Sequence, residues 1–295
     1  MQLLMQQLLN GIALGAIYAL FAVGFSLILA KMGILNVAHG TFATWGALSS
    51  YWLVTELGLS FWLALAAGVV FAGALGVAAD LVAFEPLRRR DAGTFAPIIA
   101  SIGIWIVLLT LAEAFAGPTA TGYPAEAVPS ERIRVAGLLL LPAQVISVAA
   151  LVVVVTGVHL LLTRSRFGAA VRAVSVDPRS ATIVGVNARL VLIAVAFLAA
   201  AIAGLAGVLA ALSDNNVSFG IGEALLLKGF AAVVVGGYGD IRGAALLGVG
   251  IGVIEVMSAQ YISSGFRDAI TFGVLLVVLV FRPQGIFGER QLVRA

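Results

Sequence analysis

Apolar residues run along this chain in long blocks that carry few charges. The long blocks cover 8–30, 61–84, 95–116, 138–162, 190–212, 243–262 and 266–281, and two shorter ones cover 40–55 and 224–237. A membrane-spanning helix needs about 20 mainly apolar residues, and the blocks lack the alternation of a membrane β-barrel. The pattern predicts an all-α, polytopic transmembrane helical bundle of eight or nine spans, with the two short blocks as candidate half-helices.

Composition supports the same class. Hydrophobic residues make up 62% of the 295 residues and charged residues 11%, whereas a soluble domain carries roughly 25% charged residues. We therefore expect one transmembrane domain over 1–295. The chain has no cysteine, which excludes disulfides and thiolate metal sites. The opening "MQLLMQQ" lacks the basic start of a cleaved signal peptide.

Basic residues are distributed unevenly between the loops. Arginines gather in the segments 88–90, 163–189 and 282–294. Because basic loops stay on the cytoplasmic side, these three segments are predicted to be cytoplasmic and the loop 117–137 external. Nine crossings then place the N-terminus outside and the C-terminus inside.

One interruption separates the first long block from the first short one. In "KMGILNVAHG", residues 31–40, Gly33 and Gly40 bracket Asn36 and His39. Non-helical backbone at membrane depth survives only inside protein or beside a water-filled cavity. We interpret the segment as a broken helix that lines a substrate pathway; an ordinary loop at the membrane surface is the alternative.

A second interruption has a similar composition. "VVVGGYGDIRGAALLG", residues 233–248, contains Gly236, Gly237, Asp240 and Gly243. Paired, glycine-interrupted short segments in two halves of a chain mark the binding sites of transporters. The sequence therefore predicts two related halves with broken helices, whose interruptions face one central path through Asn36 and Asp240.

Three charged residues lie inside or near the apolar blocks. Glu113 and Glu255 are candidates for a functional role because intramembrane carboxylates are costly, and pairing between helices is the alternative. Lys228 begins a short apolar segment and is predicted to extend its ammonium to the interface.

The basic segment 163–189 differs in kind from the blocks around it. Asp177 and Pro178 are typical of a helix start, and Gly185 follows as a stop. Before them, "FGAAVRAVS" predicts a short helix that contains Arg172. Such a small cytoplasmic helix suits docking into a cleft of another protein; an amphipathic connector attracted to anionic lipid is the alternative.

Catalytic motifs are missing from the sequence. It contains no phosphate-binding G-x-x-x-x-G-K-[ST], no H-E-x-x-H and no G-x-S-x-G. We therefore expect a pore-forming subunit that is not an enzyme, or an ion-coupled secondary transporter in which Asp240, Glu113 and Glu255 carry protons.

Several stretches, taken in order, resemble one known family. They are "NGIALGAIYALFAVGFSLI", "MGILNVAHGTF", "SRFGAAVRAVSVDPRSATIVGVN", "LKGFAAVVVGGYGDIRGAALLG" and "FRDAITFGVLLVVLVFRPQGIFG". From Asn10 to Gly288 the chain is similar to the permease subunits of branched-chain amino acid ABC importers, the LivH type. The resemblance favours the importer over the ion-coupled carrier.

This resemblance implies a fold, a set of partners and a location. The fold is that of ribose-type importer permeases, in a multi-pass protein of the bacterial inner membrane surrounded by lipid. The partners are a second homologous permease, two cytoplasmic ATPases that hold ATP and magnesium, and a periplasmic substrate-binding protein. No cofactor, metal or nucleic acid is expected on this chain.

The resemblance also assigns a role to 163–189 and a class of substrate. The segment corresponds to the coupling helix that docks on an ATPase, and its contact positions would be Arg172, Asp177, Pro178, Ala181 and Gly185. The substrates would be branched-chain amino acids or related small polar solutes. Because "SDNNVSFGIG" at 213–222 departs from the family pattern, urea, short amides and aromatic acids stay open as alternatives.

Overall fold

The computed structural model describes residues 1–33, 35–93, 95–135, 137–282 and 284–287. The predicted arginine segment at 282–294 lies largely outside the described residues. The helices before the hairpin are α1 (Gln2–Met32), α2 (His39–Thr55), α3 (Phe61–Ala79), the π-helical turn η1 (Asp80–Phe84), α4 (Glu85–Arg89) and α5 (Phe95–Ala116). After the strands β1 (Ile133–Val135) and β2 (Leu138–Leu140) come α6 (Pro142–Arg164), α7 (Arg166–Val176), α8 (Pro178–Ile183), α9 (Ala188–Asp214), α10 (Ile221–Gly236), α11 (Ile241–Tyr261), the 3-10 turn η2 (Ser264–Phe266) and α12 (Arg267–Phe281).

Seven helical stretches of the described chain are long and apolar enough to cross a membrane. They are α1, α3 continued through η1 and α4, α5, α6, α9, α11, and η2 with α12. The remaining apolar helices, α2 and α10, have 17 and 16 residues, fewer than a full span needs. The prediction of a polytopic helical bundle with two short segments is confirmed.

Helices α1 and α9 form the centre of the bundle. Helix α1 packs against α11, α9, α6 and α10, and α9 packs against α3 and α2 as well. Most of α1 and α9 is buried, whereas α5, α6 and α12 bury few of their residues and leave the rest partly or fully exposed. Exposed apolar helices around a buried centre are the arrangement expected of a protein surrounded by lipid.

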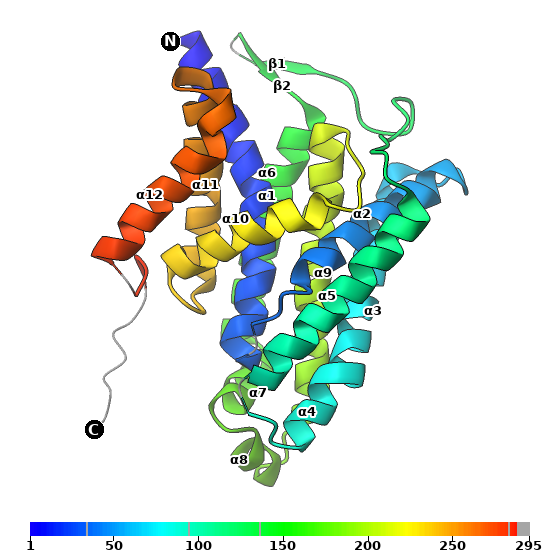
Figure 1. The fold of residues 1–295 in the computed structure, drawn as a ribbon, viewed down its shortest axis with the longest axis vertical. Helices are drawn as coiled ribbons and strands as arrows, with labels where there is room; N and C mark the ends of the chain where they lie inside the picture. Colours follow the sequence, from blue (N-terminus) through cyan, green and yellow to red (C-terminus); the bar gives the residue numbers. More distant parts are fainter. Residues whose placement is uncertain (34, 94, 136, 283, 288–295) are drawn as a thin grey trace.

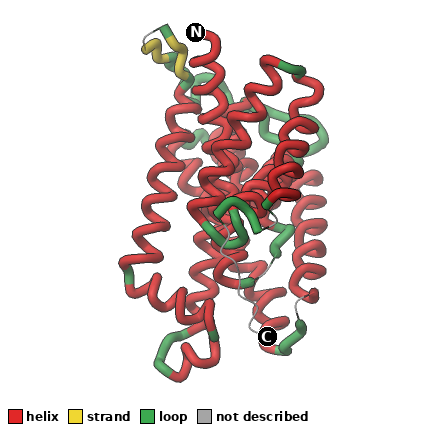
Figure 2. Tube along the Cα trace, turned by 90° about the vertical axis from the view of Figure 1, so that its left-hand side faces the viewer, coloured by secondary structure: helices red, strands yellow, loops and turns green. Residues whose placement is uncertain are grey.

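The two ends of the bundle differ in composition. Helix α4, with its arginines, and the α7–α8 segment lie at one end, and the N-terminus and the β1–β2 hairpin lie at the other (Figure 1). Figure 2 shows the same separation from the side, with the long helices running between the two ends. The geometry agrees with the predicted placement of the arginine segments opposite the loop 117–137.

The apolar block 138–162 is not a single helix: a strand ends and a helix begins inside it, although apolar residues predominate throughout. Its first residues form β2, which pairs antiparallel with β1, and α6 begins only at Pro142. Gly137 has a φ of 81° in the turn between the strands. The amide side chain of Gln6 accepts a bond from the Leu139 nitrogen at 2.9 Å and donates one to its carbonyl at 2.8 Å. This pairing holds the apolar residues 138–140 as a strand.

Glycines bring α1 and α11 into close contact. A Cβ atom placed on Gly252 would lie 2.2 Å from the backbone nitrogen of Gly15, and one on Gly248 would lie 2.4 Å from the Cα of Ala19. Real Cβ contacts do not come so close, so the two helices can pack here only through glycine. Small residues promote such packing in lipid, where burial of apolar side chains between helices gains little.

Candidate functional site

The first interruption lies between α1 and α2 and is packed inside the protein. Helix α1 ends at Gly33 in the left-handed conformation, with a φ of 65°. Asn36 is 2% exposed, and its side-chain oxygen accepts a bond from the Ala38 nitrogen at 3.1 Å. The Val37 nitrogen donates to the Ser101 hydroxyl of α5 at 3.1 Å. Side chains thus satisfy backbone groups that the broken helix leaves without partners.

His39, the first residue of α2, is surrounded by aromatic rings. Its side chain is 0% exposed, and the rings of Phe21, Phe25 and Phe42 meet it edge-on at 4.9, 5.4 and 6.1 Å between centroids. Neither ring nitrogen has a hydrogen-bond partner among the described residues; the Phe21 carbonyl lies near the ring, outside bonding geometry. A buried polar group without a partner costs about 1–3 kcal/mol.

The two short helices meet at their first turns. A Cβ atom on Gly222 of α10 would lie 1.9 Å from the carbonyl oxygen of Gly40 of α2. The Thr44 hydroxyl accepts a bond from the Gly222 nitrogen and donates one to the Phe219 carbonyl, both at 3.1 Å. These contacts define what we call the α2–α10 junction, comprising Gly40, Thr44, Phe219 and Gly222.

The segments that lead into the junction have related designs. Helix α9 ends at Asn215, which adopts the left-handed conformation with a φ of 45°, as Gly33 does at the end of α1. Helices α1 and α9 run in opposite directions, and each is followed by a short helix that turns back into the bundle (Figure 1). Inverted repeats of transporters have this arrangement. The structural counterpart of the first interruption is therefore 215–220.

The predicted second interruption, 236–243, forms the turn between α10 and α11. A Cβ atom on Gly243 would lie 2.3 Å from the Gly236 carbonyl oxygen, and Gly237 has a φ of 112°. Asp240 accepts bonds from the nitrogens of Arg242 at 2.8 Å and Gly243 at 3.3 Å, and so caps α11. Asn36 and Asp240 thus bond to different partners, each within its own turn; a shared pathway through these two residues stays a prediction.

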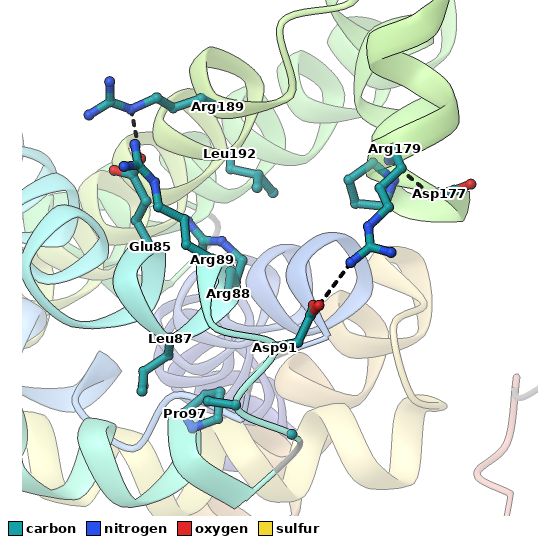
Figure 3. Close-up of a pocket in the computed structure, with 13 residues that line it drawn as sticks. Glu85, Leu87, Arg88, Arg89, Asp91, Pro97, Asp177, Arg179, Arg189 and Leu192 are labelled. Carbon is teal, nitrogen blue, oxygen red and sulfur yellow. Dashed lines mark hydrogen bonds and ion pairs between the residues drawn. The ribbon is translucent and has the colours of Figure 1, made fainter.

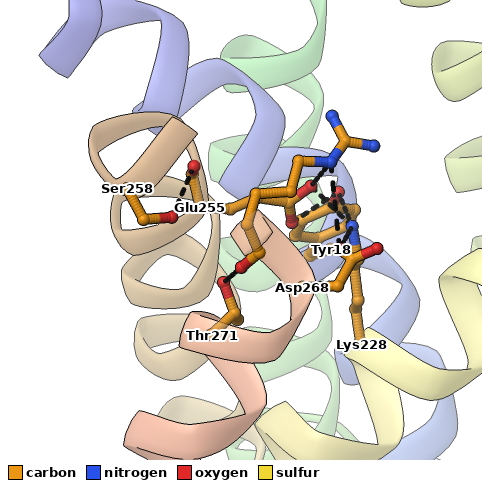
Figure 4. A network of polar contacts seen from close by, with 7 residues as sticks. Tyr18, Lys228, Glu255, Ser258, Asp268 and Thr271 are labelled. Atoms are coloured by element: carbon orange, nitrogen blue, oxygen red, sulfur yellow. Dashed lines mark hydrogen bonds and ion pairs between the residues drawn. The ribbon is translucent and has the colours of Figure 1, made fainter. Parts of the chain in front are cut away.

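The structure brings together a cluster of charges that the sequence did not predict. The Lys228 ammonium of α10 lies 2.6 Å from Glu255 of α11, and the Tyr18 hydroxyl of α1 accepts a bond from Lys228 at 3.0 Å and donates one to Glu255 at 3.1 Å. Asp268 lies 3.2 Å from Lys228, and Arg267 lies 3.5 Å from Glu255. We call these five residues the charge cluster (Figure 4).

The charge cluster corrects one prediction and decides another. Lys228 does not extend to an interface: it is buried and paired, because Glu255 lies on the neighbouring helix. Pairing between helices, the alternative considered for Glu255, is confirmed. Glu113 is exposed on α5. The cluster joins α1, α10, α11 and α12, and its signals in the sequence were the cation Lys228 and the carboxylate Glu255 inside apolar blocks.

The segment 163–189 folds as predicted from its caps. Helix α7 is followed by α8, whose N-cap is Asp177 with Pro178 in the first turn. The Asp177 carboxylate accepts bonds from the Ser180 hydroxyl and the Arg179 nitrogen, and these bonds hold the pKa of Asp177 below its usual range. Gly185 follows the helix with a φ of 86°.

The predicted contact positions of this segment are not all exposed, and other residues of the segment are. Ala181 is buried against the membrane domain, so it faces inward and does not offer its side chain to a partner. Arg172 is exposed, and its guanidinium bonds to the Leu162 carbonyl near the end of α6. Ile183 and Val184 are 86% and 76% exposed. These two apolar residues form what we call the α8 tip.

A cleft of about 1060 Å³ opens between this segment and α4. Figure 3 shows Arg179 of α8 reaching across it to Asp91, with 2.8 Å between the charged atoms. On the opposite wall, Arg88 forms two bonds to the buried Asp80 at 2.8 and 2.9 Å. The pair of Arg179 with Asp91 connects α8 to the loop that joins α4 to α5.

Comparison with known proteins finds a family and relatives that match this chain over most of its length. Residues 7–279 match the family described as branched-chain amino acid transport system / permease component. The chain is 31% identical to the high-affinity branched-chain amino acid transport system permease protein BraD of Pseudomonas aeruginosa, over 97% of this chain and 96% of that protein. It is 30% identical to the LivH permease protein of Escherichia coli, with the same coverage.

A solved structure shares the fold at low sequence identity. PsaBC from Streptococcus pneumoniae in complex with Fab aligns with a TM-score of 0.52 and 14% identity, over 96% of this chain and 93% of that chain.

Proposed function

The chain belongs to the family of permease components of branched-chain amino acid transport systems, and from this membership we propose that it conducts branched-chain amino acids across the bacterial inner membrane. It is a multi-pass membrane protein and a permease of an ABC importer. A permease works within a transporter complex. The ion-coupled carrier considered from the sequence belongs to a different class.

Our proposal for the complex includes a second homologous permease, two cytoplasmic ATPases carrying ATP and magnesium, and a periplasmic binding protein. The sequence has no phosphate-binding motif of its own, which supports ATP hydrolysis on separate chains. The α8 tip supports the docking site: exposed apolar residues at the arginine-rich end of a membrane protein are typical of a protein interface.

The observation that carries the proposed coupling is the construction of α8. Asp177 caps the helix, Ala181 anchors it against the membrane domain, and Arg179 ties it to Asp91. The helix is thereby fixed to the membrane domain while Ile183 and Val184 point outward. A movement of a partner seated on the α8 tip would be transmitted to α4, α5 and α9 through these contacts.

For the substrate path, we propose that the α2–α10 junction is the closed point of the passage. The first turns of two short helices meet there through Gly40 and Gly222 with no room for a side chain. Broken helices whose ends meet inside the protein are the elements around which transporters alternate their access.

The coupling proposal is tested with the complete transporter in proteoliposomes. The double variant Ile183→Asp, Val184→Asp should weaken ATPase binding on the order of 100-fold, as loss of buried interface anchors does, and should abolish ATP-driven uptake while membrane insertion stays normal. Arg132→Asp, an exposed substitution at the opposite end of the bundle, is the control. ATPase subunits that still copurify with the double variant would disprove docking at the α8 tip.

The substrate class is tested separately. Uptake of labelled leucine should be inhibited by isoleucine and valine and left unchanged by urea, short amides or aromatic acids. Inhibition by one of the latter in place of isoleucine would assign the chain to a different substrate within the same family.

A further inference from the structure

The cleft beside α8 lies where three apolar helices reach the arginine-rich end of the bundle. Its walls come from α4 and the loop after it, from the start of α5, from the start of α8 and from the start of α9. Exposed apolar side chains continue from these walls along the outer surface of the bundle, among them Val82, Phe95 and Leu190. Basic and apolar surfaces thus meet at the mouth of the cleft.

One wall of the cleft carries an uncompensated positive charge. The Glu85 carboxylate is shared by Arg89 and Arg189, whose Nε atom lies 2.9 Å from it. The other ion pairs of the cleft match one arginine with one acid, Arg88 with Asp80 and Arg179 with Asp91. The remaining acid of the lining, Asp177, lies on the α8 wall, where its carboxylate caps the helix. Two guanidiniums on one carboxylate leave a local excess of one positive charge.

The two guanidiniums are also available for another ligand. Arg89 and Arg189 have side chains that are 67% and 59% exposed. A guanidinium has five N–H donors, and the ion pairs to Glu85 involve a single nitrogen of each. Both residues line the cleft, and the remaining donors of each guanidinium have the fork geometry that suits phosphate oxygens.

We propose that this cleft binds the phosphodiester of an anionic phospholipid from the cytoplasmic leaflet. Arg89 and Arg189 would hold the phosphate, and the volume of about 1060 Å³ leaves room for the glycerol and the first acyl carbons along Leu87, Pro97 and Leu192. Basic pockets between membrane helices on the cytoplasmic side recognise such headgroups. The cytoplasmic orientation rests on the proposed function.

A lipid fits this position better than the ATPase does. Helix α8 lies farther along the bundle axis than α4 (Figure 1), so a docked ATPase meets the α8 tip first. The cleft lies on the membrane side of α8, and Arg179 and Asp91 join across it. A lipid bound there would contact α4, α5 and α9 together, and would stabilise the support on which α8 rests.

The test uses the complete transporter in nanodiscs of phosphatidylcholine with or without phosphatidylglycerol, and native mass spectrometry counts the phosphatidylglycerol that stays bound. The wild type should retain it selectively. The double variant Arg89→Gln, Arg189→Gln should bind it on the order of 30-fold more weakly, since each arginine near a membrane contributes about fivefold. Arg164→Gln, which removes an exposed arginine at the same end and outside the cleft, should leave binding unchanged.

A variant with the opposite expected effect separates lipid binding from a loss of structure. Glu85→Gln removes the carboxylate that competes for both guanidiniums, so phosphatidylglycerol should bind about fivefold more tightly. Weaker or unchanged binding in this variant would overturn the proposal. So would loss of the ATPase subunits with no change in lipid, or equal thermal stabilisation by inorganic phosphate in pure phosphatidylcholine. Lipid retention is read without transport, so failure of the proposed transport function would be seen independently.

Discussion

The interruption at 33–40, which leads into the α2–α10 junction, and the α7–α8 segment are both breaks between helices, yet they use similar residues in opposite ways. Each has a side-chain oxygen that caps nearby amides, Asn36 in one and Asp177 in the other, and each follows or precedes a left-handed glycine. The first break is buried and leaves no space between glycines, while the second exposes apolar residues at its tip. Local capping chemistry makes a break; burial decides whether the break closes a passage or offers a docking surface.

This difference predicts opposite sensitivities. Added atoms should be harmful at the junction, where backbone touches backbone, and tolerated at the exposed side chains of α8, such as Ile183 and Val184. Gly185 is the exception there, because its φ of 86° disfavours any side chain. Loss of apolar surface should harm the α8 tip more than the junction. The predictions below probe this contrast.

The largest effect is expected from Gly222→Val. Its Cβ atom would lie 1.9 Å from the Gly40 carbonyl oxygen and 2.6 Å from the Thr44 hydroxyl, so α2 and α10 would have to separate. Overpacking usually costs about 1–3 kcal/mol. Here the clash is with backbone, which cannot move aside as a side chain does, so we expect a cost above that range. We expect little folded protein by size-exclusion chromatography in detergent.

Gly220→Ala is the matched control for that variant. Gly220 precedes α10, has a φ of −86° and would meet no atom within 4 Å of an added Cβ. Normal yield and uptake are expected. If Gly222→Val also folds and transports normally, the junction is not the tight contact described above.

The second largest effect is expected in the charge cluster. Lys228→Met leaves Glu255 buried without its principal partner, and breaking a buried pair costs about 3–5 kcal/mol. The melting temperature of the purified permease should fall clearly. The double variant Lys228→Met, Glu255→Gln should recover much of the loss, because no buried charge then lacks a partner. A double variant less stable than Lys228→Met alone would contradict this account.

Local features of the sequence predicted more than long-range ones did. The short helices, the cap at Asp177 and the stop at Gly185 follow from the length of apolar blocks and from capping chemistry, and the structure has them all. The partner of Lys228 was missed because Glu255 reaches it only through the packing of α10 on α11. The strand at 138–140 was missed for a similar reason, since its pairing depends on β1 and on Gln6 of α1.

The match between the two interruptions also depended on local composition and could not take account of contacts in space. Similar composition matched 33–40 with 236–243, whereas the arrangement of the helices in space matches 33–40 with 215–220. Asn215 adopts the left-handed conformation that Gly33 has, and a non-glycine residue in that role is hard to recognise from composition. Inverted repeats preserve geometry and direction of the chain, which short composition matches do not record.

A smaller effect, in the stabilising direction, is expected from His39→Leu. The imidazole is buried among Phe21, Phe25 and Phe42, and neither nitrogen bonds to a residue that the structure describes. Removing an unpaired buried polar group recovers about 1–3 kcal/mol, so the closed junction should become more stable and transport slower. His39→Gln, which stays polar, should give no such gain. Faster uptake by His39→Leu would show that the ring stabilises the closed state.

The smallest effect is expected from Asp177→Ala, which removes the cap of α8 without touching its apolar tip. Loss of an N-cap costs about 1 kcal/mol, and Asp177→Asn should retain most of it. Because hydrogen bonds hold the pKa of Asp177 below that of the unfolded chain, the carboxylate stabilises α8 above a pH of about 4, and this contribution is lost as the pH falls through the folded value. Amide hydrogen exchange at Ser180 and Ala181 measures how much the cap stabilises α8. Exchange that is equal in Asp177→Ala and the wild type at neutral pH would mean that the ion pair of Arg179 with Asp91 alone holds the helix in place.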